Sequence, residues 1–187
     1  MAKKKEAKTS RSLSKKLDLD GAQDSKNLDK LKVGWFTFTC SEDSTIMFTE
    51  LMNEHYQEWF NLIDFKNFRL LKKNGRAKDL DVAFVEGAIC DPIDAKKLKD
   101  IRKNCKKLIA IGSCAVVGKP SAQRMDFTEE QKKEIEFIIS RFHYAKKIYA
   151  LHELVKVDES VPGCPMDCNK FLEILNKQLQ EFGVKNA

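Results

Sequence analysis

The sequence predicts an α/β protein with a doubly wound parallel sheet, formed as a single domain behind a basic amino-terminal tail. Short apolar runs recur along the chain, and amphipathic stretches with helical spacing separate them. Such runs are typical of strands that are buried on both faces of a parallel sheet. The 187 residues, 42% of them hydrophobic, are enough for one domain with its own core.

Residues 1–30 form the basic tail, and residues 31–187 form the predicted domain. The tail holds nine Lys or Arg and five Asp or Glu, so it carries +4 of the net charge of +6. It has few large apolar residues, and we expect it to be disordered. A basic tail can bind nucleic acid or an anionic membrane, but we expect neither partner here. The chain shows no secretory signal and no apolar run near the length of a membrane span, so we expect it in the cytoplasm.

Four apolar runs predict the strands of the sheet, and a fifth segment adds a further strand. The four runs are Lys32–Phe38, Leu80–Val85, Lys107–Ile111 and Lys147–Leu151, and the further segment is Asn61–Leu71. Helical periodicity fills the gaps between them, in Thr45–Phe60, Asp94–Asn104, Thr128–Phe142 and Asn169–Phe182. Strands that alternate with helices in this way predict parallel pairing.

The third of these helices has a recognisable start. Thr128 is a plausible N-cap, and Gln131 stands at the position that completes a capping box. Apolar residues follow at helical spacing, and we expect this face to pack on the core: Ile135, Ile138, Ile139 and Phe142.

Three cysteines follow predicted strands. Cys40 comes directly after the first strand, Cys114 follows the turn after Lys107–Ile111, and Cys164 lies in a Pro-Gly-Cys-Pro turn after the last strand. Carboxyl ends of parallel strands meet at one edge of a sheet, where ligands bind. Cytoplasmic thiols stay reduced, so three converging cysteines favour a soft metal or an iron–sulfur cluster over disulfides.

A four-iron cluster takes four ligands, and two residues compete for the fourth place. Asp43 stands where the second cysteine of a C-x-x-C pair would lie, and carboxylates also bind iron. Cys168, four residues after Cys164, is the competing fourth ligand. We expect Cys90 and Cys105 to be buried or surface thiols that bind no metal.

Four short motifs follow one another along the chain: Cys40-Ser41-Glu42-Asp43, Val85-Glu86-Gly87-Ala88, Gly112-Ser113-Cys114 and Pro162-Gly163-Cys164-Pro165. In this order they resemble the motifs of [NiFe]-hydrogenase small subunits and of the related 20-kDa-type subunit of respiratory complex I, where the first motif is C-x-G-C. The similarity covers roughly residues 31–180. The first motif departs from the pattern at Glu42 and Asp43, and an aspartate there looks like the variation of some archaeal F420-type hydrogenases.

The resemblance implies a flavodoxin-like domain that holds one [4Fe–4S] cluster through Cys40, Asp43, Cys114 and Cys164. It also implies a large subunit that carries the Ni–Fe centre, and we expect a further electron-transfer subunit, because no second set of cluster cysteines follows. Glu86 is expected either near the subunit interface or as a carboxylate that caps or ties a loop. We expect the helix Thr45–Phe60, including Met47, to form much of that interface.

Two other functions remain open. One is electron transfer in a nickel-free, complex-I-like oxidoreductase, because the nickel ligands belong to the partner. The other is a flavodoxin-like or nucleotide-binding protein with incidental cysteines. The chain has neither a G-x-G-x-x-G nor a G-x-x-x-x-G-K-[ST] motif, which argues against a nucleotide-binding protein. We favour the hydrogenase subunit. In that role the chain is the electron-transfer subunit of an oxidoreductase and not its catalytic subunit.

Overall fold

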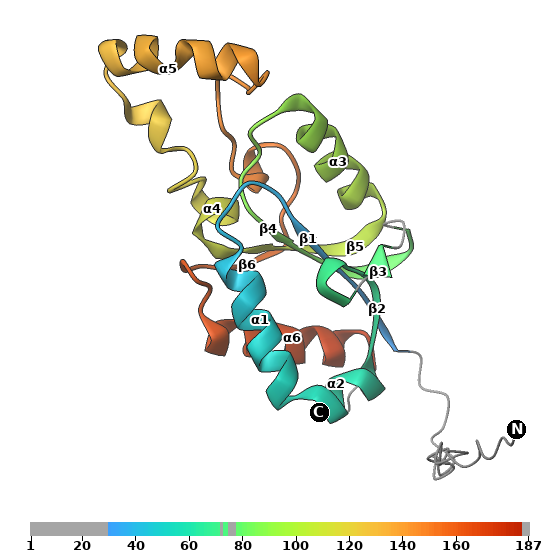
Figure 1. The fold of residues 1–187 in the computed structure, drawn as a ribbon. Helices are drawn as coiled ribbons and strands as arrows, with labels where there is room; N and C mark the ends of the chain where they lie inside the picture. The colour runs from blue at the N-terminus through green and yellow to red at the C-terminus, as the bar shows by residue number, and fades with distance from the viewer. Residues whose placement is uncertain (1–29, 72, 75–77, 185–187) are drawn as a thin grey trace, which may run out of the picture.

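The computed structural model describes residues 30–184, apart from 72 and 75–77. All of the predicted disordered tail except its last residue, Lys30, therefore lies outside the described residues. The described strands form one sheet in the order β3-β2-β1-β4-β5-β6 (Figure 1). Five of them run parallel, and β3 (Lys73–Asn74) pairs antiparallel with β2. The parallel strands are β1 (Leu31–Thr37), β2 (Ile63–Phe68), β4 (Leu80–Glu86), β5 (Cys105–Ile111) and β6 (Glu159–Val161).

This strand order confirms the predicted flavodoxin-like α/β fold. Without the short β3, the order 2-1-4-5-6 is the flavodoxin arrangement, whose ligand site lies where the order reverses, between β1 and its neighbour β4. The apolar runs predicted β1, β4 and β5, and the further segment Asn61–Leu71 contains β2.

The predicted strand Lys147–Leu151 is wrong. Within it, Tyr149 forms only an isolated antiparallel bridge with Ile89, and a 3₁₀ turn (Leu151–Glu153) follows. Ile148, Ala150 and Leu151 are buried, so the apolar run reflects packing of an irregular segment. The last parallel strand is instead β6, a three-residue Glu-Ser-Val segment that pairs with β5 and is too short and polar to be recognised.

Helices cover both faces of the sheet (Figure 1). On one face lie α1 (Asp43–Glu54), α2 (Tyr56–Leu62) and α6 (Cys168–Glu181), and on the other lies α3 (Pro92–Lys103). The first face buries an aromatic cluster in which Trp35 of β1 stacks on Phe48 of α1, with ring centroids 4.4 Å apart. The single helix predicted over Thr45–Phe60 is wrong, because it breaks at His55 between α1 and α2.

The helix α5 (Glu129–Arg141) stands away from the sheet, at the top of Figure 1. Its capping box is confirmed, with the Gln131 N–H donating to Thr128 Oγ1 and the Thr128 N–H donating to Gln131 Oε1. The prediction that its apolar face packs on the core is wrong. None of its residues is buried, and Ile138 and Phe142 are 48% and 59% exposed. None of the described helices has both the length and the apolar composition to cross a bilayer.

Asp158, the residue before β6, ties that short strand to the sheet. Its Oδ2 accepts the Leu108 N–H at 2.9 Å and lies 3.4 Å from Nη2 of Arg102. Burial raises the pKa of the carboxyl, but the Leu108 N–H, Arg102 and Lys156 together hold the pKa below its usual value. A carboxyl with a lowered folded pKa adds stability above its unfolded pKa, and this stability is lost as the pH falls through the folded pKa.

We therefore expect Asp158→Asn to lower the free energy of unfolding by about 1–3 kcal/mol near neutral pH. The difference from the wild type should begin to shrink as the pH falls below about 4, the ordinary aspartate pKa. It should be smallest below the still lower folded pKa, where the wild-type carboxyl is also neutral. Urea denaturation at both pH values measures this. Asp126→Asn is the control, because its pair with Lys119 is solvent-exposed, at 60% and 58%. An equal loss of stability at both pH values would contradict the proposed ionic contribution.

Candidate functional site: a cysteine-lined pocket at the sheet edge

Three loops meet where the strand order reverses, at the carboxyl edge of the sheet. Cys40 follows β1, Cys114 lies in the short helix α4 (Gly112–Val117) after β5, and Cys164 lies in the loop after β6. These three cysteines and Asp43 line one small pocket. The structure thus brings all four predicted ligands together, although they are up to 124 positions apart (164 − 40) in the chain.

Hydrogen bonds hold the three loops against one another. The Ser113 N–H donates to the Gly163 carbonyl at 2.7 Å, and the Met166 N–H donates to Ser44 Oγ at 3.3 Å. Gly112 adopts a left-handed φ of 80°, and a Cβ at this position would lie 3.0 Å from Ser44 Oγ. A glycine is therefore required for α4 to approach the start of α1 this closely.

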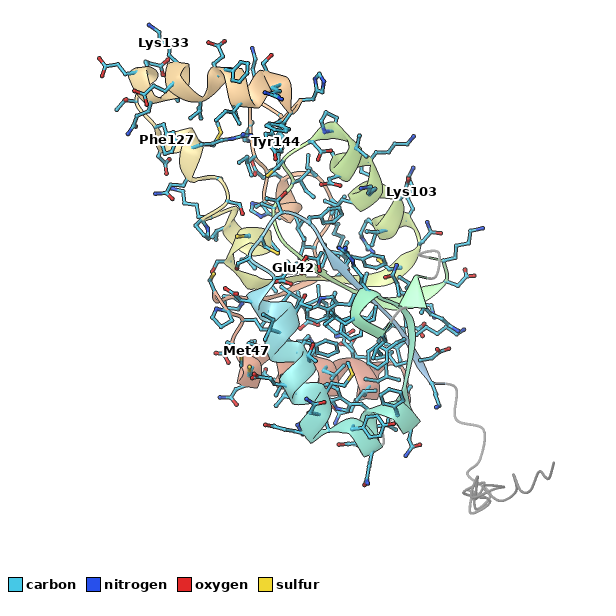
Figure 2. All side chains as sticks on the ribbon, in the orientation of Figure 1. Glu42, Met47, Lys103, Phe127, Lys133 and Tyr144 are labelled. Atoms are coloured by element: carbon cyan, nitrogen blue, oxygen red, sulfur yellow. The ribbon has the colours of Figure 1, made fainter. Side chains whose placement is uncertain are left out.

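Glu86, at the end of β4, caps α1 from across the pocket. Its side chain is 3% exposed, and it accepts the Ser44 N–H at 3.1 Å and the Thr45 hydroxyl at 2.6 Å. Glu42, the residue before α1, has a left-handed φ of 63° and forms no capping bond; Figure 2 shows it at the upper end of the helix. Of the two roles open for Glu86, the structure shows the capping one.

The three cysteines that line the pocket differ in how deeply they are buried. Burial raises the pKa of Cys40 to about 12, and the nearby Glu86 and Cys114 also raise it. The Glu42 N–H, 3.4 Å from Cys40 Sγ, acts in the opposite direction. Cys114 is 6% exposed, whereas Cys164 is exposed. The pocket therefore reaches from the core to the surface.

Asp43 and Cys168, the competing fourth ligands, lie in different places. Asp43 is the first residue of α1, and the Ser41 hydroxyl donates to its Oδ2 at 2.8 Å beside the pocket. Cys168 is the first residue of α6 and packs against the aromatic core cluster, and it is not among the residues that line the pocket. The geometry therefore favours Asp43.

Cys90 and Cys105 do not line the pocket either. Cys90 is buried in a small cluster that also contains Cys114, and burial raises its pKa. Cys105 begins β5, and burial likewise raises its pKa, while the nearby Arg102 acts to lower it. Neither thiol lies among the donors predicted to bind metal.

Two serines contact the predicted ligands, and neither was assigned a role from the sequence. Ser41 bonds to Asp43, and the Ser121 hydroxyl lies 3.2 Å from Cys114 Sγ. Ser41 was recognisable by its place beside Cys40. Ser121 was not, because its contact depends on how the chain turns after α4.

The donor set fits a cluster of several irons. Three thiols and one carboxylate combine soft ligands with one harder ligand, a chemistry that iron accepts. Within residues 30–184, the gaps at 72 and 75–77 aside, no three His, Cys, Asp or Glu side chains are grouped to hold one metal ion. A cubane instead spreads its protein ligands over separate irons. That these four residues bind iron stays a prediction.

The chain is an α/β protein with a flavodoxin-like sheet and cysteines on three adjoining loops. Comparison with known proteins identifies its family. The family described as NADH ubiquinone oxidoreductase, 20 Kd subunit, matches residues 40–178. The chain belongs to this family. The match begins at Cys40 and includes the other three predicted ligands.

The curated relatives include several hydrogenase subunits. The delta subunit of the NAD-reducing hydrogenase HoxS of Cupriavidus necator is 31% identical over 111 residues, 51% of this chain and 53% of that one. The delta subunit of sulfhydrogenase 2 of Pyrococcus furiosus is 27% identical over 78% of this chain and 60% of its own. The gamma subunit of the coenzyme F420 hydrogenase of Methanococcus voltae is 30% identical over 54% of this chain and 38% of its own. The chain thus spans about half the length of the first of these relatives.

Solved structures confirm the fold. A chain of an NAD⁺-reducing [NiFe]-hydrogenase in the H₂-reduced state superposes with a TM-score of 0.67 at 20% identity, covering 81% of this chain and 92% of that one. A chain of the actinobacterial-type NiFe-hydrogenase from Ralstonia eutropha H16 gives a TM-score of 0.59 at 16% identity, covering 88% of this chain and 57% of that one. At these identities the likeness shows a shared fold.

The Glu86 network predicts a measurable coupling. Glu86→Leu and Thr45→Val should each lower the free energy of unfolding by about 1–3 kcal/mol, because each leaves a buried polar partner unsatisfied. The double variant should lose less than the sum, by about 0.5–3 kcal/mol, since both changes break the same 2.6 Å contact. Urea denaturation of the four proteins measures this, with the exposed Glu173→Gln as a control. Strictly additive losses would show that the contact adds no stability.

Proposed function

We propose that this chain is the small electron-transfer subunit of a [NiFe]-hydrogenase, holding one [4Fe–4S] cluster in the cysteine-lined pocket. Such a cluster, when bound, accepts and releases one electron at a time. Cys40, Asp43, Cys114 and Cys164 would hold the cluster, which would relay electrons between the Ni–Fe centre of a large subunit and a further redox subunit. The protein's own work would be to position and tune the cluster.

The observation that carries this proposal is the convergence of Cys40, Asp43, Cys114 and Cys164 on one pocket. Hydrogenase names among the relatives supply the reaction class. The thiols must stay reduced to bind iron, which supports a place in the cytoplasm.

Exposed apolar residues around the pocket support a large-subunit partner. Ile46, in the first turns of α1, is 55% exposed, and Val117, at the end of α4, is 63% exposed. Val117 lines a second shallow pocket together with the exposed Cys164. Met47, which we expected at the interface, is half-buried and packs partly on the core. The interface is thus proposed around Ile46 and Val117.

A nickel-free, complex-I-like complex is the second candidate, because the matched family carries the name of a complex I subunit. The test is the nickel, iron and acid-labile sulfide content of the complex purified anaerobically through this chain. We expect nickel in an amount about equal to this chain, with iron and sulfide in excess. Iron and sulfide without nickel would support the second candidate, and a complex without iron would overturn the cluster.

Single substitutions test the ligand set. Cys114→Ala should lose the cluster, because a buried thiolate ligand is removed, whereas Asp43→Cys should keep a cubane with a changed reduction potential. Cys105→Ala and Cys168→Ala are matched controls and should keep the wild-type iron content, since neither thiol lines the pocket. Iron and sulfide analysis with electron paramagnetic resonance spectra measures all four. An unchanged cluster in Cys114→Ala would refute the site.

A further inference from the structure

Ser121 lies beside the sulfur of a proposed ligand, although it belongs to a different segment from the ligands themselves. Its hydroxyl is 3.2 Å from Cys114 Sγ and 3.1 Å from the Thr39 carbonyl oxygen. The loop that carries it follows α4 directly. The Gly118 N–H donates to the Cys114 carbonyl at 3.0 Å, and the Ala122 N–H donates to the Gly118 carbonyl at 2.8 Å. These bonds fix Ser121 relative to Cys114.

The single proton of this hydroxyl has two possible acceptors. While Cys114 is a thiol, its sulfur is a weak acceptor, and the Thr39 carbonyl is the better partner. A thiolate bound to iron has no proton and carries negative charge, so it becomes the stronger acceptor. The Thr39 carbonyl also accepts the Ala88 N–H at 2.9 Å. The hydroxyl can therefore turn to the sulfur without leaving that carbonyl unsatisfied.

We propose that Ser121 is a positioning residue that donates a hydrogen bond to the Cys114 thiolate and thereby raises the reduction potential of the bound cluster. Donors to cluster sulfurs stabilise the more negative, reduced state. Cys114 is 6% exposed, so little water is available to replace the hydroxyl. This inference rests on the proposed function, because it requires a cluster at Cys114.

The test compares Ser121→Ala with Ser121→Thr in the anaerobically purified complex. Midpoint potentials come from redox titrations followed by electron paramagnetic resonance of the reduced cluster. Ser121→Ala should keep the iron and sulfide content and shift the potential to more negative values. Ser121→Thr keeps a hydroxyl and should stay closer to the wild type. Ser160→Ala, at an exposed position in β6, should leave the potential unchanged.

A second readout follows the proton itself. The paramagnetic resonance spectra of the wild type and Ser121→Thr should contain a coupling between the cluster and one exchangeable proton. Transfer to D₂O should alter this coupling, and Ser121→Ala should lack it. If Ser121→Ala loses iron, a Thr variant with a full cluster and this coupling still supports the hydroxyl's role.

The outcomes separate this inference from the proposed function. Wild-type potential in a fully loaded Ser121→Ala, with the same exchangeable coupling, would overturn the role of Ser121 and leave the cluster in place. Absence of iron from the wild-type complex would overturn both.

Discussion

The geometry of the site depends on the hydrogen bonds that the buried Glu86 carboxylate accepts. A carboxylate removed from water is costly unless hydrogen bonds compensate for its lost hydration. Glu86 receives two such bonds from the first turn of α1, at 3.1 and 2.6 Å. Because Glu86 ends β4, these bonds fix the start of α1 relative to the sheet. Cys40 and Asp43 lie at or just before that start, so their places in the pocket follow from it.

Parallel pairing supplies the rest of the pocket. β1, β4, β5 and β6 run in the same direction, so the loops after them meet at one edge of the sheet. The contacts of Ser113 with Gly163 and of Met166 with Ser44 then set the distances between the loops. The Ser121 hydroxyl, in the loop that follows α4, contacts the sulfur of Cys114. Short hydrogen bonds between the loops thus hold the predicted ligand residues in place.

Two errors in the predicted fold share one physical cause. Apolar patterning indicates that a segment has an apolar face but does not identify what covers that face. Lys147–Leu151 buries its apolar residues without pairing as a strand, whereas α5 forms as its capping box predicts and leaves its apolar residues exposed. β6 escaped recognition because three residues carry too little periodicity, and pairing with β5 creates the strand.

The sequence by itself determined the parallel α/β class, three of the buried strands, the start of α5, the three candidate cysteine ligands and the two candidates for the fourth place, because these depend on local pattern and on short motifs. Only the tertiary structure decided that Asp43 and not Cys168 lies at the pocket, that Glu86 caps α1, and that Ser121 reaches Cys114. The first two facts depend on contacts between residues distant in the chain, and the third depends on how the chain turns after α4. Such contacts are fixed by how loops pack at the sheet edge, and no local pattern records that packing.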